Sequence, residues 1–495
     1  MSALCKGRDT MTVLPTGSGK SLIYQVLAML IDRPVVTLFP LIALMQDQER
    51  SLQRNNVPVV RLDSTLGVRD RRAALERVRE GGKLVILTTP ETLESEDLKE
   101  ALKLARPALL CVDEAHCISE WGHDFRPAYL RVGMERAALG VESVLALTAT
   151  ATPKVQDDIV GRLQMQKPAI ITSPPYRDNL QLSVRNVPGS IKMAAAGKLI
   201  RRLSRPGIVY CATTKAVDEI FGALKRAGIP VARYHGRMTK TERVRAQKKF
   251  VQRRGRMVMV ATSAFGMGID KPNIRYIMHY QVPGSVEQYV QEIGRAGRDG
   301  RPARCVLLFD EADLDIQKRL AAKSHVNANQ LEALGDAIIA WAEDGRDFKV
   351  EDVALSAQVV TTACRALCNQ IEEAGLLERN SDRSLRAKVD IETLRSGIAE
   401  LAQQFAVVQR EDLRRINRIA EYALAKECRS VYMRKWFGEE SPPECGRCDN
   451  CRAGQSGQPF RQKKKPERDR PKQHKRHRSR KQGQSRKEST PSQPD

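Results

Sequence analysis

The chain has 495 residues and is 41% hydrophobic, which is enough for two or three ordinary domains with apolar cores. Its 83 Lys and Arg residues against 59 Asp and Glu residues give a net charge of +24, which favours a polyanionic partner, and DNA, RNA or an anionic membrane surface would each satisfy this. No apolar run approaches the roughly 20 residues of a membrane span, and no secretory signal begins the chain, so we expect a soluble, intracellular protein of the cytoplasm or nucleoid with no membrane partner.

The first pattern along the chain is a phosphate-binding loop. A strand-like segment, 9–13, leads into TGSGKS at 16–21, and 22–31 has the apolar periodicity of a helix. Glycines let backbone N–H groups approach phosphate oxygens, Lys20 brings positive charge to the β and γ phosphates, and the Ser21 hydroxyl can ligate Mg²⁺. We therefore predict ATP and Mg²⁺ as ligands, and a glycine-rich turn with a chance lysine is the alternative. The predicted nucleotide-binding residues here are Thr16, Gly17, Ser18, Gly19, Lys20 and Ser21.

An acidic motif, DEAH at 113–116, follows a second strand-like segment at 108–112. Nucleotides bind beyond the carboxyl ends of strands in open α/β sheets, so Asp113 is placed to ligate Mg²⁺. Glu114 is the candidate base for activating water. Four chance residues are the alternative, which the upstream phosphate loop argues against.

The segment after the acidic motif is dense in aromatic and basic residues. Bases stack on aromatic rings for about 1–3 kcal/mol each without sequence preference, and an arginine can contact phosphate or nucleotide. A core position for Trp121 is the alternative. The predicted binders of single-stranded DNA in this segment are Trp121, His123, Phe125 and Arg126.

Further motifs occur in an order that resembles the RecQ family of superfamily 2 DNA helicases. The segments that resemble its motifs Ia, Ib, III, IV, V and VI are 35–48, 88–91, 146–151, 207–215, 258–280 and 291–300. The resemblance covers residues 1–310 and again 428–451. It implies two RecA-like α/β lobes with parallel sheets, 1–172 and 173–310, which face each other across the nucleotide.

The resemblance also implies residues that complete the site. A cation that arrives from the second lobe on closure stabilises the transferred phosphoryl group and is worth about 10³–10⁵ in rate. Arg298 is the first candidate and Arg295 the second, with a solvated glycine-rich loop as the alternative. His116, together with motif III, is expected to relay the state of the γ-phosphate to the DNA side. In motif V, Gly268 and Asp270 are expected at the nucleotide.

Residues 311–427 form a longer connection than the resemblance predicts. Apolar residues recur at helical spacing in 330–342 and 353–374, and 381–390 reads as a short hairpin. A small winged-helix unit and an ordinary three-helix module are both compatible with this pattern. The pattern from 391 to 437 is mainly helical.

Four cysteines have the spacing of a metal site. Cys428 is followed by Cys445, Cys448 and Cys451, and four thiolates can close a tetrahedral Zn²⁺ shell. The resemblance implies the RecQ zinc subdomain, a hairpin at 428–453, and an iron–sulfur cluster is the alternative. The other cysteines are expected to be small buried apolar residues; they are Cys5, Cys111, Cys117, Cys211, Cys305, Cys364 and Cys368.

The C-terminal segment, 454–495, is polar and basic. Residues 461–495 contain 14 Lys and Arg against four Asp and Glu, or +10, with too few apolar residues to form a core. We expect a disordered tail that adds salt-sensitive affinity for phosphate backbones, and a tail without a role is the alternative.

The resemblance implies an ATP-dependent DNA helicase that moves 3′-to-5′ and unwinds duplex DNA in recombination and repair. Its expected partners are single-stranded and forked DNA and DNA repair proteins. The chain has only 14 residues before Pro15, so the family's adenine-reading front of lobe 1 is expected to be missing, as are its usual domains after Cys451. The alternatives are an RNA-dependent ATPase and a non-catalytic DNA-binding or annealing protein.

Overall fold

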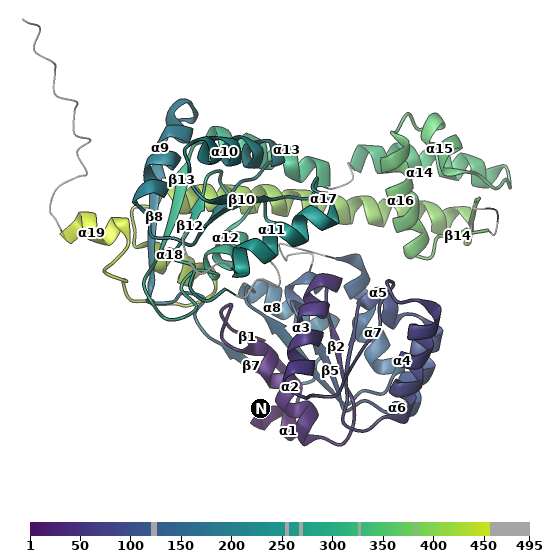
Figure 1. Cartoon of the computed structure of the whole chain (residues 1–495). Helices are drawn as coiled ribbons and strands as arrows, with labels where there is room; N and C mark the ends of the chain where they lie inside the picture. The colour runs from purple at the N-terminus through teal and green to yellow at the C-terminus, as the bar shows by residue number, and fades with distance from the viewer. Residues whose placement is uncertain are drawn as a thin grey trace, which may run out of the picture.

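The computed structural model of the chain describes residues 1–119, 126–252, 257–266, 271–324, 328–380, 382 and 384–455. Two α/β lobes lie side by side, and a mainly helical segment extends from the second one (Figure 1). Five of the predicted site residues lie outside the described residues, as does the tail from residue 456 onward. These five are Trp121, His123, Phe125, Gly268 and Asp270.

The first lobe is built on a parallel seven-stranded sheet. Its strands are β1 (Thr10–Val13), β2 (Val35–Leu38), β3 (Val59–Arg61), β4 (Val85–Thr88), β5 (Leu109–Val112), β6 (Ser143–Thr148) and β7 (Ala169–Thr172). They lie in the order β3-β4-β2-β5-β6-β1-β7, and every pair is parallel. The inner strands are buried along their whole length, as expected where helices cover both faces of a parallel sheet.

Helices cover both faces of this sheet. Successive residues of a strand enter different apolar clusters, with Val36 in one and Val35 in the other. The helices are α1 (Ser2–Cys5), α2 (Lys20–Leu30), α3 (Ile42–Arg54), α4 (Val68–Glu80), α5 (Pro90–Leu93), α6 (Glu96–Ala105), α7 (Val132–Ala138) and α8 (Pro153–Arg162), with 3-10 helices at Ala115–Ile118 and Pro127–Arg131.

The second lobe repeats this plan with six parallel strands. They are β8 (Leu180–Asn186), β9 (Gly207–Tyr210), β10 (Val231–Tyr234), β11 (Val258–Ala261), β12 (Tyr276–His279) and β13 (Ala303–Phe309). Their order is β10-β11-β9-β12-β13-β8, so β8 is an edge strand that pairs along its whole length with β13. The helices are α9 (Gly189–Arg202), α10 (Thr214–Arg226), α11 (Lys240–Gln252) and α12 (Val286–Ile293). The predicted fold class of two RecA-like parallel-sheet lobes is confirmed.

A separate apolar core lies beyond the second lobe. It is built from α14 (Ala328–Glu343), α15 (Val350–Ser356), α16 (Thr361–Glu373) and an antiparallel hairpin, β14 (Leu377–Arg379) and β15 (Leu385–Ala387). Phe348 bridges to Leu385 and adds a third strand position. We call residues 328–389 the winged-helix unit, because three helices and a wing hairpin occur in that order.

The expectation of one continuous helix over 353–374 is wrong. The chain leaves the helix after Ser356 and re-enters one at Thr361. Between them Gln358 has a φ of 53°, in the left-handed region that a right-handed helix cannot contain. Apolar periodicity resumes in the same phase after this turn, which is why the sequence pattern resembled a single helix.

A long helix connects the winged-helix unit to the C-terminal part of the chain. Helix α17 (Ile391–Leu424) has 34 residues and is therefore about 50 Å long. It starts where Asp390 accepts a hydrogen bond from the Thr393 N–H (2.9 Å). Its first half packs on α14, its middle on α13 (Ala312–Ser324), and its end reaches α12 and α18 (Arg429–Trp436) (Figure 1). A last helix, α19 (Asp449–Gln455), includes residues 454 and 455, which were expected in the tail.

Within the described residues, no helix combines the length and apolarity that a membrane crossing requires.

Candidate functional site

The phosphate loop lies between β1 and α2. Leu14 continues the strand by donating its N–H to the Thr148 carbonyl (3.0 Å). Gly17 and Gly19 both have a φ of 85°, which side-chain-bearing residues rarely adopt, so the loop can curl back at these two positions. The backbone then enters α2 at Lys20, whose Nζ donates to the Leu14 carbonyl (3.1 Å). Lys20 is thereby held across the mouth of the loop.

Lys20 is half-buried beside both carboxylates of the acidic motif. Burial lowers the pKa of Lys20, Glu114 and Asp113 act to raise it, and Arg298 acts to lower it. Lys20 of the phosphate loop, the two carboxylates and Arg298 therefore lie near one another. A half-buried ammonium group there can interact with phosphate oxygens more strongly than one in bulk water.

Asp113 lies at the carboxyl end of β5. Its N–H donates to the Leu38 carbonyl (3.0 Å), which fixes it beside β2. Burial, followed by repulsion from Glu114, raises the pKa of Asp113 to about 7, and Lys20 opposes this shift. Two crowded carboxylates favour a cation, and Asp113 and the Ser21 hydroxyl supply the hard oxygen ligands that Mg²⁺ prefers. The donor set therefore fits Mg²⁺.

Glu114 is linked to motif III through His116. Glu114 Oε2 is 3.4 Å from His116 Nδ1, which is 3.0 Å from Thr148 Oγ1. Thr148 Oγ1 in turn accepts from the Thr150 N–H (3.2 Å). Burial lowers the pKa of His116 to about 3, helped by Lys20 and Arg126, so its imidazole is neutral at physiological pH. A chain of direct contacts thus connects Glu114 to the turn after β6.

The second lobe contributes two arginines that occupy different environments. A Cβ placed on Gly17 would lie 3.4 Å from Arg298 Cδ, so the Arg298 side chain lies against the phosphate loop. Arg295 is 5% exposed and donates through Nη1 to the Gly266 carbonyl. Arg298 is therefore the arginine positioned at the loop, and Arg295 is anchored within its own lobe.

Sequence reasoning missed the residue that holds the Arg298 loop. Arg177, in the connection between the lobes, donates through Nη2 to the Gly294 carbonyl (2.9 Å) and through Nη1 to the Gly297 carbonyl (3.3 Å). Asn179 Nδ2 also donates to the Gly297 carbonyl (2.7 Å). No local motif surrounds Arg177 and Asn179, so the pattern carried no signal for this role.

Most of the predicted nucleotide residues that are described line one cleft between the lobes, with a volume of about 1190 Å³, whereas His116 is buried and does not line it. Helices α3 and α11 also line it, which sequence reasoning missed. Gln48, at the end of the motif Ia segment, lines the cleft and accepts from the Tyr24 hydroxyl (2.9 Å). The predicted residues that line the cleft are Thr16, Gly17, Gly19, Lys20, Ser21, Asp113, Glu114, Arg295 and Arg298. Ser18 lies in the same loop, with its N–H donating to the Pro15 carbonyl.

Arg126 is tied to motif Ia. Its Nη1 donates to the Pro40 carbonyl (2.8 Å), and its N–H donates to the Cys117 carbonyl (2.9 Å). The start of the 3-10 helix Pro127–Arg131 is thereby held at the end of β2. Arg126 thus joins the acidic motif to motif Ia, beside His116.

The four predicted metal ligands converge. The Sγ atoms of Cys428, Cys445, Cys448 and Cys451 all lie within 4.8 Å of one another. Tetrahedral thiolates at a Zn–S distance of about 2.3 Å are separated by about 3.8 Å, and the Cys428 Sγ–Cys445 Sγ distance is 3.5 Å. The Cys448 N–H donates to the Cys445 sulfur and the Cys451 N–H to the Cys448 sulfur, both at 3.4 Å. The set therefore fits a closed zinc site.

The zinc ligands lie in a helix–loop–helix rather than in the expected hairpin. Cys428 precedes α18, and α19 begins one residue after Cys448. The expectation that the remaining cysteines are buried is wrong for Cys5, which is exposed at the end of α1, where the chain turns before β1. The other six are buried.

The zinc subdomain touches both lobes. Trp436 Nε1 donates to Glu287 Oε1 (2.7 Å) at the start of α12, the helix that leads to Arg295 and Arg298. Gly438 packs on Pro153, directly after motif III, because a Cβ on Gly438 would lie 2.7 Å from Pro153 Cγ. The zinc subdomain therefore contacts both lobes close to the segments that form the nucleotide cleft.

Comparisons with known proteins agree with this architecture. Three family profiles match: DEAD/DEAH box helicase at 1–159, helicase conserved C-terminal domain at 192–300, and RecQ zinc-binding at 388–452. The RecQ zinc-binding match and the four converging thiols support Zn²⁺ over the iron–sulfur alternative. Among solved structures, the Mycobacterium smegmatis helicase Lhr bound to ssDNA and AMP-PNP shares the fold, with a TM-score of 0.50, 21% identity, and coverage of 80% of this chain and 58% of that one.

Curated relatives are more similar in sequence. The probable ATP-dependent DNA helicase RecS of Bacillus subtilis is 37% identical over 372 residues, covering 74% of each chain. The ATP-dependent DNA helicase RecQ of the same organism is 32% identical over 446 residues, or 90% of this chain and 62% of its own length. The rat ATP-dependent DNA helicase Q5 is 39% identical over 353 residues, and the match covers 36% of the length of that protein. This chain therefore belongs to the RecQ family of ATP-dependent DNA helicases.

Proposed function

We propose that this chain hydrolyses ATP to ADP and phosphate and uses the cycle to move 3′-to-5′ along single-stranded DNA and to unwind the duplex ahead of it. The polarity and a role in recombination and repair are inferred from the family. The observation that carries the proposal is the composite cleft, in which Arg298 of the second lobe lies against Gly17 of the phosphate loop in the first.

The residues divide the work of phosphoryl transfer among them. Lys20 neutralises charge on the phosphates, and Ser21 with Asp113 would hold Mg²⁺, which supplies charge compensation and orients the phosphate oxygens. Glu114 orients the attacking water and accepts its proton. Arg298 completes the site only when the lobes approach each other, so hydrolysis depends on closure.

The DNA side is coupled to this chemistry through short contacts. Glu114 reaches Thr148 through His116, and Arg126 ties the same region to Pro40 of motif Ia. We propose that the aromatic segment between these points binds bases by stacking, through Trp121, His123 and Phe125, and that Gly268 and Asp270 of motif V contribute from the other lobe. Binding of a single strand then favours the closed, hydrolysing arrangement.

Single-stranded and forked DNA are the proposed partners, and DNA repair proteins are proposed as further ones. The two alternatives have weaker support. A non-catalytic protein would not need an arginine from one lobe held against the phosphate loop of the other, and the RecQ zinc-binding match favours DNA over RNA as the stimulating strand.

The test is steady-state ATP hydrolysis by the full chain without nucleic acid, with single-stranded DNA, and with RNA of the same sequence. We expect strong stimulation by DNA, weak stimulation by RNA, and loss of hydrolysis in Lys20→Ala with DNA binding retained. Unwinding of a duplex with a 3′ tail, but not of one with a 5′ tail, is expected in the same preparation. Hydrolysis that survives in Lys20→Ala, or RNA stimulation that exceeds DNA stimulation, contradicts the proposal.

A further inference from the structure

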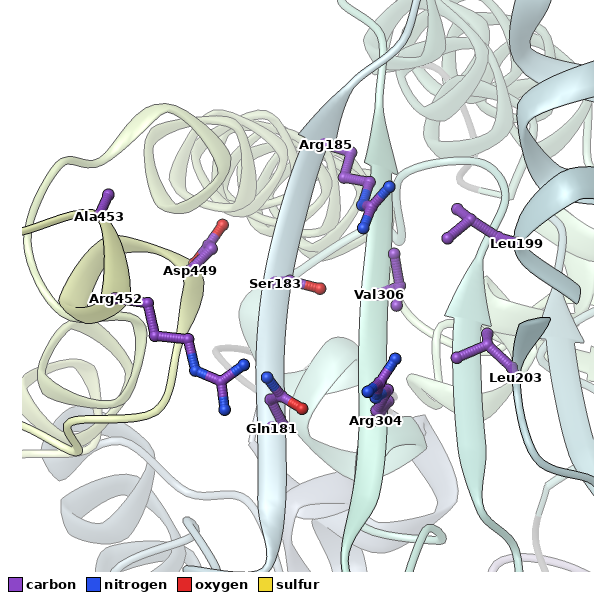
Figure 2. Close-up of a pocket in the computed structure, with 10 residues that line it drawn as sticks. All are labelled: Gln181, Ser183, Arg185, Leu199, Leu203, Arg304, Val306, Asp449, Arg452 and Ala453. Carbon is purple, nitrogen blue, oxygen red and sulfur yellow. The ribbon is translucent and has the colours of Figure 1, made fainter. Parts of the chain in front are cut away.

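A second pocket opens at the edge of the second lobe, with a volume of about 380 Å³ (Figure 2). It lies beside β8, the edge strand, between α9 and the zinc subdomain helix α19. Leu199 of α9, Leu203 directly after that helix and Val306 of β13 supply apolar surface. None of the residues that line this pocket lines the nucleotide cleft.

Three arginines surround the pocket and come from three separate elements. Arg185 belongs to β8, Arg304 to β13 and Arg452 to α19, and all three are exposed. Figure 2 shows Arg185 and Arg304 on either side of Val306, with Arg452 beside Gln181 on the opposite wall. Within the described ranges, none of the three forms a salt bridge.

The one carboxylate in the pocket is already engaged. Asp449 Oδ1 pairs with Arg429 Nε at 3.1 Å, and Asp449 Oδ2 accepts from the Val184 N–H at 2.8 Å. It therefore anchors α19 to the edge of the sheet and leaves the three guanidinium groups of the pocket without a carboxylate partner, with Arg452 donating to the Gln181 side-chain oxygen. Such a cluster, assembled from segments far apart in sequence, favours an anion.

The winged-helix unit has the opposite electrostatic character. Residues 328–389 contain 11 Asp and Glu against seven Lys and Arg. Several arginines on or beside it are neutralised in ion pairs, which are Arg365–Glu351 (2.9 Å), Arg379–Glu372 (2.6 Å), Arg386–Asp347 (2.6 Å) and Arg395–Glu343 (3.5 Å). The pocket beside β8 is therefore better suited to phosphate than the unit that has the form of a DNA-binding module.

We propose that the pocket formed by Arg185, Arg304 and Arg452 binds backbone phosphates of DNA as a contact site separate from the nucleotide cleft. Planar guanidinium forks match phosphate oxygens, and the apolar floor suits a deoxyribose. In sequence, Ala453 of the pocket is followed by a basic segment, of which residues 461–495 carry a net charge of +10. The charge of the pocket and the charge of that segment both favour a polyanion such as a DNA backbone.

This site rests on the proposed DNA substrate, so its test must not depend on hydrolysis. Fluorescence anisotropy of a labelled forked DNA, titrated with the full chain without nucleotide at several salt concentrations, compares the wild type with Arg185→Glu/Arg304→Glu. Each lost phosphate contact lowers the slope of log affinity against log salt by about 0.7 on single strands and 0.9 on duplex DNA, so we expect a decrease of about 1.4–1.8.

Two matched variants control for net charge and for local folding. Arg69→Glu/Arg79→Glu makes the same change in charge at exposed arginines of α4 and is expected to keep the wild-type slope. Arg185→Lys/Arg304→Lys keeps the charge and should retain most of the slope. DNA-independent ATP hydrolysis should be unchanged in all three, because none of these residues lines the cleft. A failure of the proposed function would instead be seen as absent hydrolysis in the wild type.

Three results would overturn the assignment. An unchanged slope in Arg185→Glu/Arg304→Glu would show that DNA does not use the pocket. An equal loss in Arg69→Glu/Arg79→Glu would show that only net charge matters. Unchanged DNA binding, together with lost binding of a polyglutamate probe, would assign the pocket to an acidic protein segment instead.

Discussion

Replacing Arg298 by alanine should lower the turnover number kcat of ATP hydrolysis by about 10³–10⁵, which corresponds to about 4–7 kcal/mol of transition-state stabilisation. The side chain lies against Gly17 and beside the half-buried Lys20, where phosphate charge would develop during hydrolysis. The KM for ATP should change far less than kcat, because this arginine acts mainly on the charge that develops in the transition state.

Two further variants make this prediction specific. Arg301→Ala removes an exposed arginine from the same glycine-rich loop and should keep kcat near the wild-type value. Arg295→Ala leaves the Gly266 carbonyl without its buried donor, so it should lower the free energy of unfolding by about 1–3 kcal/mol. DNA-stimulated hydrolysis and thermal unfolding of all three variants provide the readout. If Arg298→Ala stays within tenfold of the wild type while a folded Arg295→Ala is inactive, Arg298 is not the transition-state arginine.

Three other outcomes can be checked with the same preparations. In urea unfolding, Gly438→Ala should lower the free energy of unfolding more than Gly345→Ala does. Both glycines have a positive φ, but only Gly438 also contacts Pro153. Equal decreases in the free energy of unfolding would mean that this contact between the zinc subdomain and the first lobe is absent. His116→Ala should reduce DNA stimulation more than DNA-independent hydrolysis, and a uniform loss in both rates would remove it from the coupling path. Metal analysis should find one zinc per chain, and the Cys448→Ser variant should lose both the metal and thermal stability. A purified chain that contains neither zinc nor iron would refute the four-cysteine site.

Several features follow from short stretches of sequence, and these were predicted correctly in kind. The alternation of apolar strands and helices leads to two parallel-sheet lobes, because a parallel strand buried on both faces must be apolar throughout. The phosphate loop depends on glycines whose positive φ values are local properties. The cysteine spacing is local as well, since Cys445, Cys448 and Cys451 reach one metal from a single turn of chain.

Tertiary structure alone decided which residues from distant segments meet. The sequence ranks Arg298 ahead of Arg295, but only the packing shows that Arg298 lies against Gly17 of the other lobe while Arg295 bonds to Gly266 of its own. The role of Arg177 is visible only in the structure, where its guanidinium donates to carbonyls of the loop that carries Arg298.

The pocket beside β8 is a second case in which the sequence alone does not predict which residues come together. Arg185, Arg304 and Arg452 lie more than 100 residues apart along the chain, and they converge because β8 pairs with β13 and Asp449 anchors α19 to the sheet edge. Sequence by itself determined the local conformations and the chemistry of each segment. The meeting of uncompensated charges depends on strand order and helix packing, which are set by the burial of apolar surface over the whole chain.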